Sequence, residues 1–283
     1  NLPDGAVRKL SDDVTALGLA SDISKSFAKR AVGAVVNGGL SDLLATLPDG
    51  ANVELIDRVD LRAFELIRHD LAHILLEAVQ SLWPNTKTAI GPAIEHGFYY
   101  DFDRDTPFKP EDLPVIEKKM REIIAARTPF TCEVWTRDQA AAHFKEAGET
   151  WELALLDAIP DGEPVKIYRQ GDSLDLCRGP HMRHTGDVGT AFKLTLVAGA
   201  YWRGDAKNPM LSRIYRIAFA NKDQIVVPTV TGAADDYAKD IAQTMKQAGL
   251  RVETDIRNEK IGYKVREHAL KKIPIQIAVG TQE

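Results

Sequence analysis

The sequence predicts an α+β protein with several domains. The chain has 283 residues, enough for two or three domains. Its hydrophobic and charged fractions, 44% and 27%, are those of an ordinary globular protein. The sequence pattern also changes along the chain. Residues 1–56 suggest short strands, residues 57–220 mix strands with long helices, and residues 221–283 alternate strand and helix. We therefore predict three domains with these boundaries.

Residues 1–56 are predicted to form a small β-rich module around one helix. Pro-Asp-Gly occurs near each end of the segment, each time before a short alternating run, as expected for a turn followed by a strand. The dipeptide Asn37-Gly38 is a hairpin signal. Residues 21–32 have a helical pattern, with Ser21 or Asp22 as the expected N-cap.

Residues 61–83 are predicted to form a helix that carries two histidines on one face. His69 and His73 are four positions apart, which places their side chains together. We expect them to be turned away from the apolar stripe of this helix. The stripe consists of Ile67, Leu71, Ile74 and Ala78.

About a hundred residues later, Cys177 and His181 form a second pair at the end of a predicted strand. Leu174 and Leu176 alternate with Asp175 and Cys177, as on a half-buried strand. Arg178-Gly179-Pro180 then turns the chain and leads to His181. The two histidines from the helix could therefore meet the Cys, the Asp and the His that follow this strand.

Three interpretations of these residues are open. Three imidazoles and a thiolate suit zinc. Without a metal, the same groups can position a water and remove its proton. Alternatively, the two pairs are unrelated and each is satisfied locally, because pairs with this spacing are common.

Composition limits the classes of protein and of partner to which this sequence can correspond. No segment approaches 18 uninterrupted apolar residues, so no membrane span is predicted, and the N-terminus lacks the apolar region of a signal peptide. Two cysteines without a spacing pattern argue against a disulfide framework and suggest a cytoplasmic location. The net charge of −5 means that any binding of nucleic acid depends on local basic patches.

Two such patches are visible in the sequence. The first combines basic and aromatic residues that could contact phosphates and stacked bases, although a solvated strand edge is the alternative. It consists of Arg203, Lys207, Arg213 and Arg216 with Tyr201, Trp202 and Tyr215. The second is the stretch 251–272, with seven Lys and Arg against four Asp and Glu. A solvated helix face is the alternative there.

The last segment is predicted to be a parallel α/β domain. Its strands and helices follow in the order β-α-β-α-β, which implies a parallel sheet with right-handed crossovers. We expect this domain to be truncated, because such domains normally have more sheet and a closing helix.

Three groups of residues resemble one family, the bacterial threonyl-tRNA synthetases. Residues 67–103, 175–182 and 198–220, with the motifs RGPH and AYWRGD, closely resemble the editing domain of that family. Residues 1–56 resemble its ubiquitin-like TGS domain, which has a β-grasp fold. The last sixty residues, with the motif RNEKIG, are similar to its anticodon-binding domain.

The resemblance implies a hydrolytic pocket that removes serine mischarged onto threonine tRNA. Its catalytic residues would be His69, His73, Cys177, His181 and Asp175, with Gly91 and Tyr100 in the wall. It implies no metal in this pocket, although the related editing domain of alanyl-tRNA synthetases has a similar set and uses zinc. Glu152 stands where members of the family carry a lysine, and this departure puts hydrolytic efficiency in doubt.

The resemblance also implies contacts with tRNA. Asn258 would read an anticodon base, and Glu283 would be a second reader. Arg257 and Lys260 would contact phosphates or bases nearby, and Arg203 would belong to the tRNA surface of the editing domain. From the sequence pattern alone, Asn258 could also be the N-cap of a helix.

The chain lacks the aminoacylation core of the family. Residues 217–228 leave no room for an ATP site, for class II synthetase motifs or for a zinc site. ATP, Mg²⁺ and Zn²⁺ would belong to that core, as would most of the family's homodimer contact. We therefore expect ester hydrolysis and binding of threonine tRNA. The alternatives are a non-catalytic tRNA-binding or regulatory module and a zinc-dependent hydrolase of the alanyl type that edits in trans.

Overall fold

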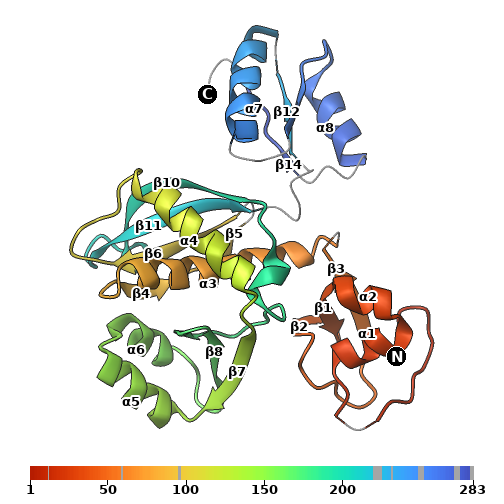
Figure 1. Ribbon diagram of the computed structural model, residues 1–283, viewed down its shortest axis with the longest axis vertical. Helices are drawn as coiled ribbons and strands as arrows, with labels where there is room; N and C mark the ends of the chain where they lie inside the picture. Colours follow the sequence, from red (N-terminus) through yellow and green to blue (C-terminus); the bar gives the residue numbers. More distant parts are fainter. Residues whose placement is uncertain are drawn as a thin grey trace. The chain divides into compact units, whose positions relative to one another are not determined.

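A computed structural model describes residues 1–11, 13–58, 60–94, 97–218, 225–230, 232–247, 252–270 and 275–280. The chain divides into two compact units (Figure 1). The first comprises Asn1–Gly189 and Leu194–Ala218, and the second comprises Thr190–Lys193 and Phe219–Glu283. The first two predicted domains therefore lie in one unit, and their exact boundaries stay predictions.

The N-terminal module is a three-stranded antiparallel sheet with two helices, in the order β2-β1-β3. Its elements are α1 (Ala16–Ile23), α2 (Lys25–Arg30), β1 (Ala31–Val36), β2 (Gly39–Ser41) and β3 (Val53–Asp57). The predicted hairpin is confirmed, because Asn37 and Gly38 join β1 to β2 with φ angles of 51° and 89°.

The prediction of one helix capped at Ser21 or Asp22 was wrong. Thr15 caps α1 by accepting a hydrogen bond from the amide of Gly18, and Ser24 caps α2 by accepting one from Phe27. Ser24 has an extended backbone, which separates the two helices. Ser21 lies inside α1, where its hydroxyl donates to the carbonyl of Leu17.

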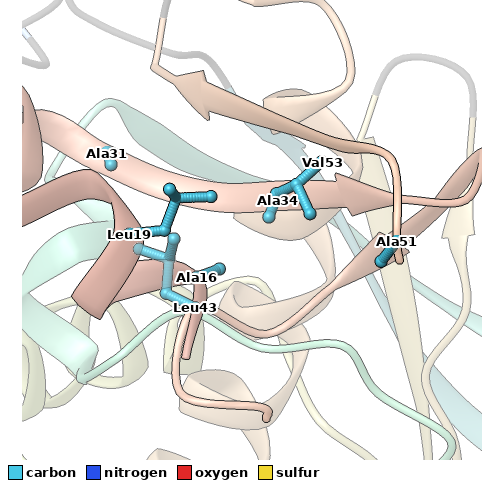
Figure 2. Close-up of a cluster of buried hydrophobic side chains, with 7 residues drawn as sticks. All are labelled: Ala16, Leu19, Ala31, Ala34, Leu43, Ala51 and Val53. Atoms are coloured by element: carbon cyan, nitrogen blue, oxygen red, sulfur yellow. The ribbon is translucent and has the colours of Figure 1, made fainter. Parts of the chain in front are cut away.

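A small apolar core joins the helix and the sheet of this module (Figure 2). It consists of Ala16 and Leu19 from α1, Ala31 and Ala34 from β1, Val53 from β3, and Leu43 and Ala51 from the connections. The strand predicted after the first Pro-Asp-Gly does not form. Residues 6–10 lie outside the sheet and Val7 is exposed, so the alternating run there has no partner strand.

The large sheet of the central region has the order β10-β11-β6-β4, with β5 also paired to β6. Its strands are β4 (Lys87–Ile90), β5 (Ala93–Ile94), β6 (Gly97–Asp103), β10 (Phe192–Tyr201) and β11 (Met210–Ala218). Helix α3 (Ala63–Leu82) packs against this sheet and against α4 (Asp112–Ala126) (Figure 1). The helix predicted over residues 61–83 is confirmed.

A smaller antiparallel sheet, β7-β8-β9, carries the second pair of candidate residues. Its strands are β7 (Phe130–Trp135), β8 (Val165–Gln170) and β9 (Ser173–Leu176). Helices α5 (Arg137–Ala147) and α6 (Thr150–Leu156) pack together beside it. Thr136 and Gln139 form a capping box at the start of α5.

The second unit confirms the predicted parallel sheet. Its elements are β12 (Ile225–Pro228), α7 (Asp235–Gln247), β13 (Val252–Asp255), α8 (Ile261–Leu270) and β14 (Ile275–Gln276). Strand β12 is central and pairs in parallel with both β13 and β14. Three short 3₁₀ turns are also present, at Thr185–Val188, Trp202–Gly204 and Gly232–Ala234.

The predicted α+β class with several domains is therefore confirmed. Among the described helices, none is both long enough and apolar enough to span a bilayer.

Candidate active site

Helix α3 is buried on almost every side, including the side that carries the histidines. The apolar stripe faces the sheet and α4, as expected. His73 is 7% exposed, however, and Asp70, one position after His69, is completely buried. The histidine face is therefore largely enclosed within the domain rather than exposed to solvent.

Strand β9 delivers an acid into the same region. Asp175 is buried, while Leu174 and Leu176 are half-buried and pack against the cluster beside α5 and α6. The expected alternation is therefore present, with the acid on the inner face. After the strand, Gly179 has a φ of 69°, in the left-handed region that favours glycine. This turn leads to His181, which is almost completely buried.

The two pairs converge on one point. The metal-binding atoms of His69, His73, Cys177 and His181 all lie within 4.8 Å of one another. Sγ of Cys177 lies 3.0 Å from Nε2 of His69 and 3.4 Å from Nε2 of His181. The centroids of the three imidazole rings are 4.5 to 4.9 Å apart. The interpretation as two unrelated pairs is therefore wrong.

Two carboxyl groups orient two of the imidazoles. Oδ2 of Asp175 lies 3.2 Å from Nδ1 of His73. Oδ1 of Asp70 lies 2.7 Å from Nδ1 of His181, and Oδ2 of Asp70 accepts the amide of Met182 at 3.0 Å. In each case the carboxyl group contacts Nδ1 of the ring, so Nε2 of the same ring points away from the carboxyl group. Asp70 was not singled out from the sequence, because its partners His181 and Met182 are distant along the chain.

Burial controls the ionisation of the pocket. It lowers the pKa of His69 to about 4 and of His181 to about 3, and it moves the pKa of His73 well below 6.5. It raises the pKa of the Cys177 thiol, with a further increase from the charge of Asp175. At neutral pH the pocket therefore holds three uncharged imidazoles and a protonated thiol.

The wall residues named in the sequence analysis also lie together. A Cβ atom at Gly91 would clash with the ring of Tyr100, so this close approach requires glycine. The hydroxyl of Tyr100 donates to Oδ2 of Asp175 at 3.4 Å. Glu152 from α6 is 2% exposed and is hydrogen-bonded to Asp175. Burial raises the pKa of Glu152 well above its ordinary value, so Glu152 is protonated and donates this bond.

The donor set fits a zinc ion. The set of three histidines and one cysteine matches structural and catalytic zinc sites in ligand type and number. A carboxyl group on the second nitrogen of a ligating histidine is the usual outer support of such sites, and both Asp70 and Asp175 are placed in this way. The same uncharged imidazoles can instead hold a water and accept its proton.

Comparisons with known proteins point to one family. The model of the "Threonyl and Alanyl tRNA synthetase second additional domain" matches residues 165–215. The models of the "TGS domain" and the "Anticodon binding domain" match residues 1–57 and 224–283. The threonine–tRNA ligases of Rhodopseudomonas palustris and Brucella canis are each 58% identical over 79% of this chain. The threonine–tRNA ligase of Rhizobium rhizogenes is 53% identical over 87% of it.

The chain belongs to the threonyl-tRNA synthetase family. It spans about a third of the length of these relatives, with 34% of the first two and 36% of the third covered. The RNA-binding domain of a threonyl-tRNA synthetase from Cryptosporidium parvum Iowa II matches 66% of this chain and 54% of its own, at 15% identity. Its TM-score of 0.22 is too low to support a comparison of folds.

The aminoacylation core of the threonyl-tRNA synthetases is absent from this chain. In the family that core lies between the editing and anticodon-binding domains. Here only residues 216–223 separate the two matches. This confirms the expectation from the sequence.

In the anticodon-binding unit, the sequence-predicted tRNA residues differ in how accessible they are. Asn258 and Lys260 are exposed, just before α8. The guanidinium of Arg257 is held by Asp255 and Glu267, at 2.7 and 2.9 Å. Because α8 begins at Ile261, Asn258 is not its N-cap. Glu283 lies outside the described residues.

The basic and aromatic patch predicted near residue 210 is only partly a surface. Arg213 forms a bidentate ion pair with Asp101, and Arg216 is buried. Trp202 is also buried. Arg203 is exposed, and its guanidinium donates to the carbonyl of Ala154 at 3.4 Å. The patch as a whole is therefore not available to RNA, and its interpretation as a solvated strand edge does not hold for the buried members either.

Proposed function

We propose that this chain hydrolyses the seryl ester of threonine tRNA. The observation that carries the proposal is the convergence of three uncharged imidazoles, a thiol and Asp175 in one pocket. The match to the second additional domain supports an editing role. We assign the catalytic work to His69, His73, Cys177, His181 and Asp175, and the pocket wall to Gly91 and Tyr100.

In the proposed reaction, His73 is the proton acceptor. Nδ1 of His73 faces Asp175, so Nε2 can accept a proton from a water while the carboxylate stabilises the imidazolium that forms. The resulting hydroxide attacks the ester carbonyl. The bond between the carbonyl carbon and the ribose oxygen then breaks, and the proton passes from His73 to that oxygen. The products are free serine and uncharged tRNA.

A second pocket is useful because a synthetic site rejects serine poorly. Serine lacks only one methyl group of threonine, which is worth about 1–3 kcal/mol in binding. A separate hydrolytic site can remove the serine that is attached in error. Ligation of threonine to tRNA would require the aminoacylation core, which this chain lacks.

We assign binding of threonine tRNA to exposed residues of both units. Asn258 would read an anticodon base, with Lys260 and Arg257 nearby, and Arg203 would contact the tRNA near the editing domain. Glu283, which lies outside the described residues, is assigned as a second reader. Proofreading of tRNA agrees with the cytoplasmic location suggested by the cysteine content. A homodimer like that of the family would depend on the core and stays a prediction.

Deacylation of seryl-tRNA for threonine, compared with threonyl-tRNA, tests the proposal directly. His73→Ala or His181→Ala should lower the rate on the order of 10²-fold or more, the usual effect of losing a proton-transfer group. Affinity for the tRNA should hardly change. His143→Ala, outside the pocket, is the matched control. If both pocket variants hydrolyse seryl-tRNA as fast as the parent, this pocket is not the hydrolytic site.

A zinc-dependent hydrolase of the alanyl type is the second candidate. It is favoured by the four donor atoms within 4.8 Å and by the two carboxyl groups behind them. Metal analysis of the purified chain decides between the two mechanisms. One zinc per chain, lost in Cys177→Ser, would support this candidate, whereas full activity in a metal-free chain would exclude it.

A further inference from the structure

We propose that Asp42 of the TGS module is a positioning residue for the editing pocket. Asp42 directly follows β2 and lies far along the sequence from the catalytic residues. Its Oδ1 accepts the backbone amide of His181, and its Oδ2 accepts the hydroxyl of Tyr168 at 2.9 Å. One carboxyl group of the TGS module therefore holds both the loop that carries His181 and the strand beside it. This inference rests on the proposed hydrolysis.

The loop needs such support because it has no regular secondary structure. Residues 177–183 belong to no helix or strand, so their backbone amides must find other acceptors. Asp70 accepts the amide of Met182 and fixes the imidazole of His181. Asp42 accepts the amide of His181 itself. The backbone and the ring of this histidine are thus fixed by two different acids.

Tyr168 extends the effect of Asp42 to the preceding turn. The ring of Tyr168 lies 4.3 Å from that of His181, measured between centroids. Its hydroxyl lies so close to Gly179 that a Cβ atom there would clash. The bond from this hydroxyl to Asp42 therefore fixes the ring against which both the turn and His181 pack. A shift of Tyr168 would move Cys177 relative to His181.

A second contact attaches the loop to the same module. Arg183 donates to the carbonyls of Ala28 and Lys29, at 3.3 and 3.5 Å, and is held in place by both oxygens of Asp187. The loop is therefore fixed to the TGS module on either side of Met182. This module therefore supports the pocket structurally.

The kinetic test uses the full chain with Asp42→Ala, Asp42→Asn and the control Asp49→Ala. Asp49 is an exposed acid of the same module. Asp42→Ala should lower kcat for seryl-tRNA on the order of 10- to 100-fold, the scale of a small misplacement of catalytic groups. KM should be unchanged. Asp42→Asn keeps one carbonyl oxygen as acceptor for His181 and should restore most of kcat. Asp49→Ala should match the parent.

Hydrogen exchange measured by mass spectrometry tests the contact without relying on activity. In Asp42→Ala, amides in residues 178–184 should exchange roughly tenfold faster, because a buried hydrogen bond is lost. Exchange in Asp49→Ala should equal that of the parent. Unchanged exchange in Asp42→Ala, or a kcat equal to that of an active parent, would overturn the role of Asp42. So would an Asn variant as slow as the Ala variant. A parent that does not deacylate seryl-tRNA would instead refute the proposed hydrolysis, and the exchange data would still decide the positioning role.

Discussion

On acidification, Asp175 is protonated before any of the three histidines of the pocket. Burial raises its pKa to about 6, whereas the three histidines titrate at lower pH. Below pH 6 the carboxyl group becomes protonated and no longer stabilises a positive charge on His73. We therefore expect the deacylation rate to fall as the pH drops through about 6. Single-turnover rates between pH 5 and 8 measure this.

Asp175→Asn provides the control for this pH dependence. The amide does not titrate, so the variant should be slow but nearly independent of pH over the same range. If it keeps the same decrease near pH 6, another group is responsible and the assignment to Asp175 is wrong.

Glu152, at the position where the resemblance to the family implies a lysine, acts as a hydrogen-bond donor to Asp175. In protonated form it donates to Asp175, which lowers the pKa of that carboxyl group against the effect of burial. A lysine would add a positive charge to the same contact. We expect Glu152→Lys to raise the deacylation rate, on the order of tenfold or about 1.4 kcal/mol. It should also move the decrease near pH 6 to lower pH.

Two observations check this prediction at Glu152. Glu152→Gln keeps a donor of the same size and should have a rate close to the parent. Thermal unfolding of all three chains shows whether buried lysine destabilises the domain. An unchanged rate in a folded Glu152→Lys would mean that the departure from the family has no effect on catalysis.

The site residues that could be found from the sequence are those that lie a few positions from another reactive side chain. The pairs at His69 and Cys177 are local signals, so their convergence could be predicted. Asp42, Asp70 and Tyr168 could not be singled out, because their importance comes from contacts with residues distant in the sequence. An isolated acid or tyrosine carries no signal of such a contact.

Among the elements, those with strong periodicity or turn chemistry were predictable. The hairpin at Asn37-Gly38, helix α3 and the parallel strands of the second unit all formed as expected. Residues 6–10 have the right alternation but no partner strand, which no local pattern reveals. The break at Ser24 was missed because the helical pattern continues through it, although a serine can end one helix and cap the next.

Substitutions in the segment just before α8 should affect tRNA binding and leave hydrolysis unchanged. Asn258 is exposed, and its neighbour Arg257 is engaged by Asp255 and Glu267. Asn258→Ala should therefore weaken tRNA binding by about 1–3 kcal/mol, the scale of a base-specific contact. The single-turnover rate at saturating tRNA should be unchanged. Gln247→Ala, an exposed polar residue of α7 in the same unit, is the control for binding measured by filter assay. Equal affinity of the two variants would contradict a role of Asn258 in reading the anticodon.

At the scale of the whole molecule, the chain combines the pocket proposed to be hydrolytic with an anticodon-binding unit and has no aminoacylation core between them. Activation of threonine requires a site for ATP, and only residues 216–223 separate the two matched domains. We therefore expect pyrophosphate exchange with threonine and ATP to stay at background in the purified chain. A relative that spans the full length of the family is the positive control in the same assay. Exchange above background, persisting after repeated purification, would mean that an ATP site exists within these 283 residues and that the domain assignment is wrong. Background exchange together with deacylation of seryl-tRNA would identify a chain that can remove an amino acid from tRNA but cannot attach one.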